Sequence, residues 1–367
     1  MNVRRFFSSL IVLCGLLLVA GGLLVLSRRP EDVTSAVPPT GTPVPALSSG
    51  PAPTLTVEPP APSPTPTINA PTPTPSADLL AQPTRDLTPT PLPAITPTTT
   101  SSATLRFDGQ KAYAHVLAQV AIGPRPTGSP QGWATGDYII EQLKALGWTV
   151  ETQEFVFRGV KGRNVIGKAG RGPVVILGAH YDTRPVADQD PDPAKRQQPI
   201  LGADDGASGV AVLLELARAL NRDALDREVW LAFFDAEDRG RLDGWPFSVG
   251  ARQMAQTLTV KPQAVVVVDM VGDADQAIYY ETQSDPELSA KIWAVAAQLG
   301  YGDTIIPQPK YPIIDDHLPF KELGIPAVDM IDFDYPYWHT LADTADKVSP
   351  TSLERLGRTL EAWVEKQ

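Results

Sequence analysis

The sequence predicts an α/β fold in which helices cover both faces of a largely parallel sheet. After residue 103, apolar segments of strand length alternate with amphipathic segments of helix length. The strand segments are apolar without a break, as in VVILGAH and AVVVVD. Strands that are apolar on both sides are typical of parallel sheets buried between two layers of helices. Ligands of such sheets bind beyond the carboxyl ends of the strands, so we look for functional residues there.

The expected elements follow from the spacing of the apolar residues. A helical spacing opens the domain, and an alternating segment with one exposed face follows it. After these, apolar strands and amphipathic helices succeed one another to the end of the chain. The expected helices are 130–146, 209–220, 250–258, 287–299, a short one in DDHLPFKELG and 352–364; the expected strands are 149–157, those starting at 174, 229 and 264, and PAVDMIDF.

The N-terminal segment 1–29 is predicted to be a transmembrane anchor. Residues 6–26 carry no charge, and arginines stand on both sides of them. A helix of this length can cross about 30 Å of hydrocarbon. A cleaved signal peptide is the alternative, although its apolar core would be shorter. We expect an uncleaved anchor, with the membrane as a partner and the globular domain outside the cytoplasm.

Residues 30–102 are predicted to form a disordered stalk. They are rich in proline, threonine and serine and contain few large apolar residues, as in APSPTPTINAPTPTPS. Such a composition cannot bury a core and favours extended conformations. The remaining segment, 103–367, has the composition of one globular domain. The chain has a formal net charge of −11, which argues against nucleic acid as a partner.

Acids and histidines follow the predicted strands. Carboxylates gathered at one edge of a sheet repel each other unless a cation neutralises them. Histidine together with aspartate and glutamate is a ligand set for a divalent metal of borderline softness, and zinc fits it best. The residues concerned are His180 and Asp182, Asp205, Glu237 and Asp238, Asp269, and His339.

The spacing within two of these segments suggests separate roles. His180 and Asp182 are two apart on a strand and point to the same face, so Asp182 can orient the imidazole. Glu237 and Asp238 are adjacent and point in different directions, so one can hold a metal while the other acts as acid or base. Taken alone, Asp205 before a helix would be read as an N-cap. The coincidence of five such positions at strand ends favours the metal site.

A set of motifs resembles the bacterial glutaminyl cyclases (glutaminyl-peptide cyclotransferases) and the zinc aminopeptidases that share their fold. The resemblance covers nearly all of residues 105–367 and none of the chain before them. It implies a three-layer α/β/α fold with a mostly parallel, mixed sheet, and zinc as the cofactor. The motifs, in order, are GAHYDTRP, DQDPDP, PILGADDGASGVAVLLELARAL, FFDAED, VVDMVGD, DDHLPF and YWHTLADT.

The resemblance also implies roles for individual residues. Both branches would bind zinc through Asp205, Asp238 and His339, with Glu237 as general acid/base. In the two-metal aminopeptidases, positions matching His180 and Asp269 hold a second zinc. In the cyclases one zinc is bound, and Asp269 would instead join a proton relay with Asp315.

Two positions depart from the pattern of many relatives. The ligand Asp238 stands where many of them have glutamate, a form that bacterial cyclases also show. Asp329 stands where animal cyclases have a histidine, and we expect it beside the proton relay. The DDHLPF segment resembles a cyclase feature rather than one that peptide hydrolysis needs.

The resemblance to the cyclases implies an enzyme that converts the N-terminal glutamine of peptides or proteins to pyroglutamate and releases ammonia. An aromatic wall would help to fold the substrate, and the expected pocket residues are Trp338, Tyr335 and Trp245. The alternatives are a two-zinc aminopeptidase that uses the same residues and, from another class, a catalytically inactive binding module. Because every ligand and Glu237 are present, the binding module is the weakest of the three.

Overall fold

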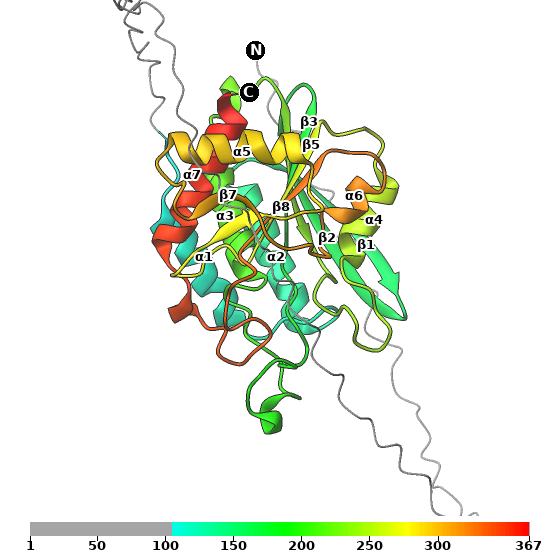
Figure 1. Ribbon diagram of the computed structural model, residues 1–367. Helices are drawn as coiled ribbons and strands as arrows, with labels where there is room; N and C mark the ends of the chain where they lie inside the picture. Colours follow the sequence, from blue (N-terminus) through cyan, green and yellow to red (C-terminus); the bar gives the residue numbers. More distant parts are fainter. Residues whose placement is uncertain (1–104, 367) are drawn as a thin grey trace, which may run out of the picture. The chain divides into compact units, whose positions relative to one another are not determined.

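The computed structural model describes residues 105–366, which form a six-stranded mixed sheet flanked by helices (Figure 1). The strand order is β1-β2-β4-β3-β5-β8. Strands β4, β3, β5 and β8 run parallel, whereas β1 and β2 add an antiparallel hairpin at one edge. The strands are β1 (Thr149–Phe157), β2 (Val160–Gly170), β3 (Val174–His180), β4 (Glu228–Phe234), β5 (Ala264–Asp269) and β8 (Ala327–Ile331).

Helices cover both faces of this sheet, which confirms the predicted fold class. Figure 1 shows α1, α3 and α7 on one side and α4 and α6 on the other. The helices are α1 (Gly109–Ile122), α2 (Pro130–Ala145), α3 (Ala207–Ala219), α4 (Val249–Thr257), α5 (Pro286–Gln298), α6 (Leu318–Lys321) and α7 (Pro350–Lys366). Short 3-10 turns span Pro193–Lys195, Arg222–Ala224 and Ala345–Lys347, and β6 (Ile278–Tyr280) pairs with β7 (Ile305–Pro309).

The central strands are buried on both faces because successive side chains enter different cores. In β3, Val175 and Leu177 pack in the larger core with α1, α3, α5 and α7, while Ile176 packs in the smaller core with α4 and α6. The same alternation runs through β4 and β5. This explains the unbroken apolar runs that predicted a parallel sheet.

The predicted helices and strands are all observed, but the sequence left out four elements. The most important omission is β2, which lies between β1 and β4 and joins the hairpin to the parallel strands. Gly162 and Gly167 in β2 face Phe155 and Leu143, so glycine takes the place of large apolar residues where neighbouring side chains fill the space. The others are α1, β6 and β7.

The N-termini of the helices differ in how they are capped. Ser129 caps α2 and Asp285 caps α5 with their side chains, each just before a proline. Helix α3 begins differently, at Gly206 in a left-handed conformation (φ 96°) and with no side-chain cap. The N-cap interpretation of Asp205 is therefore wrong, and its carboxylate is available for other contacts.

The two N-terminal segments predicted from sequence, the anchor 1–29 and the stalk 30–102, lie outside the described residues. Among residues 105–366, none of the helices is both long and apolar enough to cross a membrane.

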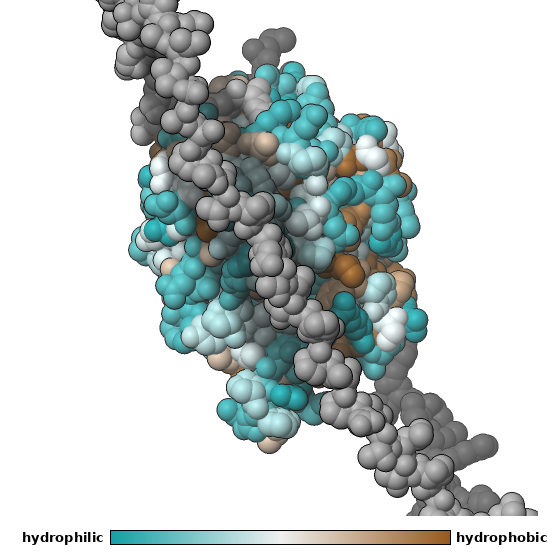
Figure 2. Space-filling view, viewed as in Figure 1, coloured by the Kyte–Doolittle hydropathy of each residue, from teal (hydrophilic) through white to brown (hydrophobic). Residues whose placement is uncertain are grey.

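The surface of the described domain is mostly hydrophilic on the face shown in Figure 2. Hydrophobic residues, in brown, are more frequent on the side where Figure 1 labels α4, α6 and β1. Large exposed hydrophobic side chains include Val156 in β1 and Leu323 just after α6. They belong to different elements, as is usual on the surface of a folded domain.

Helix α3 packs against the sheet so closely that a side chain at Gly209 has no room. A Cβ there would lie 2.3 Å from the carbonyl oxygen of Val268 and 3.0 Å from the Cβ of Ala179. We expect Gly209→Ala to lower the free energy of unfolding by about 1–3 kcal/mol, measured by urea denaturation. Gly302→Ala is the matched control, because its Cβ would meet nothing closer than 4.0 Å. Equal unfolding free energies for the two variants would contradict this account of the packing.

Candidate metal centre

The structure brings the predicted acids and histidines together at the carboxyl end of the parallel strands. Two groups of three side chains share Asp205, and within each group one ligand atom per residue lies within 4.8 Å of the others. The first group is Asp205, Asp238 and His339, and the second is His180, Asp205 and Asp269. All of these side chains are buried.

The first group has the chemistry of a divalent-metal site. Nε2 of His339 lies 3.0 Å from Oδ1 of Asp238 and 3.6 Å from Oδ2 of Asp205. Both carboxylate oxygens of Asp238 and Oδ2 of Asp205 are buried without a hydrogen-bond partner among the described residues. Burial favours the neutral imidazole, but the charge of Asp238 and the contact with Asp188 outweigh it and raise the pKa of His339 to about 9. Positive charge is thus strongly favoured here, and the donor set suits zinc.

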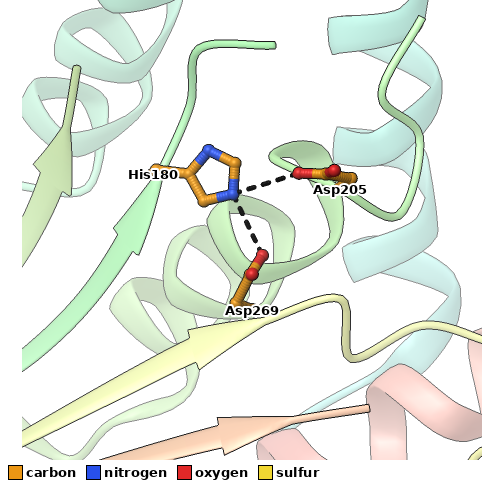
Figure 3. Close-up of side chains that lie close together, drawn as sticks. All are labelled: His180, Asp205 and Asp269. Atoms are coloured by element: carbon orange, nitrogen blue, oxygen red, sulfur yellow. Dashed lines mark hydrogen bonds and ion pairs between the residues drawn. The ribbon is translucent and has the colours of Figure 1, made fainter. Parts of the chain in front are cut away.

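The second group is held by the imidazole of His180. Figure 3 shows this ring from β3 between the carboxylates of Asp205, before α3, and Asp269, at the end of β5. Its Nε2 lies 3.0 Å from Oδ1 of Asp269 and 3.3 Å from Oδ1 of Asp205. Burial would lower the pKa of His180, but these carboxylates and Asp182 outweigh it and raise the pKa well above its ordinary value. A proton on Nε2 or a second cation would satisfy this group equally well.

Glu237 is next to the first group and has the properties of an acid/base residue. Its side chain is buried at the end of the turn that follows β4. Burial raises the pKa of Glu237 well above its ordinary value, and the nearby charges of Asp315, Asp316 and Asp238 add to this effect against that of His180. A buried carboxyl group whose pKa is raised by its surroundings is a candidate general acid or base.

Asp182 positions the turn that carries Glu237 and Asp238. Its Oδ1 accepts the backbone N–H of Glu237 (3.0 Å), and its Oδ2 accepts those of Asp238 (3.1 Å) and the hydroxyl of Thr127 (3.0 Å). Its carboxylate is 3.7 Å from Nδ1 of His180, whereas its backbone carbonyl is only 3.1 Å away. The expected role of orienting the imidazole therefore belongs mainly to the backbone of Asp182, and its side chain fixes the turn between the base and the ligand.

Asp235 has a structural role in the turn that follows β4. Its Oδ2 accepts the N–H of Arg163 (3.0 Å) and the hydroxyl of Tyr181 (3.1 Å), and its Oδ1 accepts the N–H of Ala236 (2.8 Å). Burial and the charge of Asp182 raise the pKa of Asp235 to about 7. The next residue, Ala236, has a left-handed backbone (φ 65°), so this turn is strained and needs such support.

A third buried group consists of Asp315, His317 and Asp329. Both carboxylate oxygens of Asp329 and Oδ2 of Asp315 lack a hydrogen-bond partner among the described residues. Glu281 lies 3.1 Å from Nε2 of His317, and Asp329 lies 3.9 Å from Nδ1. Burial raises the pKa of Asp329 well above its ordinary value, and the charges of Asp315, Asp269 and Glu281 raise it further. The extra acid at position 329 is therefore favoured in its neutral, protonated form.

The three expected pocket aromatics have different surroundings. Trp338 stacks on the imidazole of His339, with ring centroids 3.9 Å apart, so it borders the first group. Tyr335 is 3 % exposed and donates its hydroxyl to Asp343 (2.7 Å), which makes it part of the support below the site. Trp245 is 4 % exposed and packs against Phe157 in a separate apolar cluster behind the strained turn. The structure thus differs from the expected pocket at Trp245 and Tyr335, because both rings pack into the protein.

Other residues at the site gave no recognisable signal in the sequence. Asp343 accepts the backbone N–H groups of Asp204 (2.8 Å) and Asp205 (3.2 Å) and so fixes the turn before α3. The fully buried Arg125 donates to the carbonyls of Tyr181 (2.9 Å), Leu201 (2.6 Å) and Gly202 (2.6 Å). Asp188 and Arg184 complete the set beside His339. Each of them acts through a contact between loops that are far apart in the sequence.

Comparison with known proteins identifies the class to which this fold and site belong. Peptidase family M28 matches residues 164–364, which is more than half of the chain, and the chain belongs to this family. Within the family, the chain is placed in the glutaminyl cyclase branch by its similarity to proteins of that name. This agrees with the resemblance found in the sequence.

Three comparisons illustrate this similarity. The mouse glutaminyl-peptide cyclotransferase-like protein is 25 % identical over 298 residues, covering 71 % of this chain and 76 % of the relative. The crystal structure of Porphyromonas gingivalis glutaminyl cyclase is 33 % identical with a TM-score of 0.68, covering 72 % of this chain and 99 % of that one. A Zn-dependent exopeptidase from Parabacteroides distasonis gives the same identity and TM-score, covering 72 % of this chain and 100 % of that one.

The raised pKa of Asp329 predicts how stability depends on pH. Because the folded state keeps this proton above the ordinary pKa of 3.8, the folded state binds more protons than the unfolded state, and stability falls as pH rises. We expect Asp329→Asn to remove up to about 1.4 kcal/mol per pH unit of this fall as the pH rises above the ordinary pKa of 3.8, measured by urea denaturation. The exposed Asp243→Asn controls for the loss of a charge. If the free energy of unfolding has the same slope against pH in the unsubstituted protein and in Asp329→Asn, the carboxyl of Asp329 is ionised in the folded state and the prediction is wrong.

Proposed function

We propose that the protein is a zinc-dependent glutaminyl-peptide cyclotransferase, an acyltransferase that converts N-terminal glutamine of peptides or proteins to pyroglutamate with release of ammonia. The observation that carries the proposal is that buried Glu237 feels the charge both of Asp238, in the group with Asp205 and His339, and of Asp315, in the buried group with His317 and Asp329. The names of the similar proteins support the same reaction.

The metal site fits zinc on the evidence of its own side chains. Oδ2 of Asp205 and both carboxylate oxygens of Asp238 are buried with no hydrogen-bond partner within residues 105–366, and Nε2 of His339 faces both residues. These three residues would hold the zinc ion, which when bound polarises the γ-carbonyl of the substrate glutamine as a Lewis acid. Asp238 is one methylene shorter than glutamate, and Asp182 holds its backbone amide in place.

Glu237 would carry the proton of the reaction. The α-amine of the substrate attacks the carbonyl carbon of the side-chain carboxamide, a new C–N bond closes the five-membered ring, and the bond from that carbon to the side-chain nitrogen breaks. The carboxylate of Glu237 accepts the proton from the attacking amine and returns it to the leaving nitrogen, so that ammonia is released. Because the attack is intramolecular, the protein mainly has to hold the substrate in a folded shape, and Trp338 offers a flat apolar wall beside the zinc ligands.

Asp269 and Asp315 would stabilise this proton transfer from the other side. Asp315 contributes to the raised pKa of both Glu237 and Asp269, so these two carboxyl groups both respond to the charge of Asp315. A neutral Asp329 keeps the total negative charge of this group low. These groups can therefore share a proton while Glu237 changes its protonation state.

A two-zinc aminopeptidase is the second candidate. His180 and Asp269, together with Asp205, form the group that a second metal would occupy, and one of the similar structures is named a Zn-dependent exopeptidase. Such an enzyme would use the same Glu237 as the base for a metal-activated water. The buried group around Asp315 is not needed for that reaction, which is why we favour the cyclase.

The setting of the domain is also a proposal. From the sequence we infer that residues 1–29 anchor the protein in a membrane and that residues 30–102 hold the catalytic domain away from it, outside the cytoplasm. Peptides or protein N-termini in that compartment would then be the substrates.

The role of Glu237 can be tested by an isosteric substitution. We expect Glu237→Gln to retain zinc but to reduce turnover by at least about a hundredfold, because an amide cannot accept the proton of the amine. Ammonia release from a peptide with N-terminal glutamine measures turnover, and elemental analysis measures zinc. Glu322→Gln, at an exposed ion pair, is the control and keeps full activity. Near-normal turnover of Glu237→Gln would refute the assignment.

Zinc content and enzymatic activity, measured on one purified preparation, distinguish the cyclase from the aminopeptidase and from the binding module. We expect the purified protein to contain one zinc per chain, to release ammonia from peptides with N-terminal glutamine, and to leave aminoacyl anilides intact. Two zinc ions per chain together with anilide cleavage would identify the aminopeptidase instead. Neither activity in a zinc-loaded protein would favour the binding module.

A further inference from the structure

The two ring nitrogens of His339 face different partners. Nε2 is 3.0 Å from Oδ1 of Asp238 and faces the metal group, while Nδ1 is 3.2 Å from Oδ1 of Asp188. A neutral imidazole carries its proton on only one nitrogen, and a carboxylate beside Nδ1 favours the proton there. The lone pair is then left on Nε2, on the side where Asp205 and Asp238 lie.

Asp188 is itself held by a buried guanidinium. Nε of Arg184 donates to Oδ1 of Asp188 (3.0 Å) and Nη2 donates to Oδ2 (2.8 Å), which is the bidentate geometry that arginine forms with a carboxylate. Arg184 is 3 % exposed, whereas the side chain of Asp188 is 32 % exposed. Arg184 thus fixes the direction of a carboxylate that would otherwise be free to turn toward water.

The same guanidinium contacts the backbone of another predicted ligand. Nη1 of Arg184 donates to the carbonyls of Gly240 (2.9 Å) and Asp238 (3.3 Å). One side chain therefore links the turn that carries Asp238 with the carboxylate that faces His339. A lysine could supply the charge at this position but not the five-donor planar fork.

His339 needs this support because its backbone is strained. It has a left-handed conformation (φ 55°), which is unfavourable for a residue with a side chain. The segment that carries Asp188 also holds the backbone around it: the N–H of Gln189 donates to the carbonyl of His339 (3.2 Å), and Asp190 accepts the N–H of Leu341 (3.1 Å). Trp338 stacks on the imidazole from another side.

We propose that Arg184 and Asp188 are positioning residues that fix the tautomer and the orientation of the His339 imidazole for zinc. The carboxylate of Asp188, 3.2 Å from Nδ1, favours the proton on that nitrogen, and Arg184 holds Asp188 in place while it braces the turn of Asp238. The inference depends on the proposed zinc site but not on which reaction the site performs. Carboxylates that bind the far nitrogen of a metal-ligating histidine commonly contribute 10–100-fold in metal affinity.

The test measures zinc affinity rather than activity. Zinc dissociation constants of the full-length protein are obtained by competition with a chromophoric chelator, for the unsubstituted protein and for Asp188→Ala, Asp188→Asn and Arg184→Lys. We expect Asp188→Ala to weaken zinc binding about 10–100-fold. We expect a smaller loss for Asp188→Asn, which keeps an acceptor oxygen for Nδ1–H, and a measurable loss for Arg184→Lys, which keeps the charge but loses the fork.

A control on the same loop separates positioning from a general disturbance. Asp192→Asn changes an exposed carboxylate that contacts only its own turn, and we expect it to leave zinc affinity unchanged. Zinc affinity of Asp188→Ala equal to that of the unsubstituted protein would overturn the proposal, and so would equal losses for Asp188→Asn and Asp188→Ala, since charge alone would then be responsible. A protein that binds zinc but releases no ammonia would refute the cyclase reaction while leaving this measurement decisive for Asp188.

Discussion

The burial of several carboxylates at one end of a parallel sheet is the constraint on which the rest of this structure depends. Asp205, Asp238 and Asp269 come from three different segments and lie close together out of water. Their mutual repulsion and lost hydration disfavour the fold unless positive charge is present. The two imidazoles of His180 and His339 stand between these acids, and a zinc ion would complete the neutralisation. The burial of these acids thus disfavours the fold when no cation is bound.

A second set of buried acids accepts hydrogen bonds from backbone N–H groups next to the predicted ligands. Asp182 accepts the N–H groups of Glu237 and Asp238, and Asp343 accepts those of Asp204 and Asp205. Each of these carboxylates fixes a turn on which a predicted ligand stands, which reduces the conformational freedom of that ligand before any metal binds. This arrangement explains why so many acids are buried in a small region although only two of them, Asp205 and Asp238, are assigned to one zinc. It also couples the packing of β3 and α3 directly to the geometry of the site.

Much of the fold followed from apolar periodicity, and the exceptions have physical reasons. The strands β3, β4 and β5 were recognisable because both of their faces are buried and apolar. Strand β2 was not, because Gly162 and Gly167 leave room for neighbouring side chains instead of filling the space themselves. For the aromatic residues, Trp338 borders the metal group, whereas Tyr335 and Trp245 are turned into the protein. A sequence identifies an aromatic ring but does not give the direction in which the ring packs.

The sequence by itself determined the chemistry of the site, because an acid or a histidine at the end of each apolar strand must meet the others at one sheet edge. It gave the residues of the metal groups and the acid/base candidate Glu237. Only the tertiary structure decided how these residues are supported: Asp188 reaches His339, and Asp343 reaches Asp205, across loops that are distant along the chain. Local patterns carry no information on such pairs, because a carboxylate that binds a distant amide or imidazole looks in the sequence like any polar loop residue.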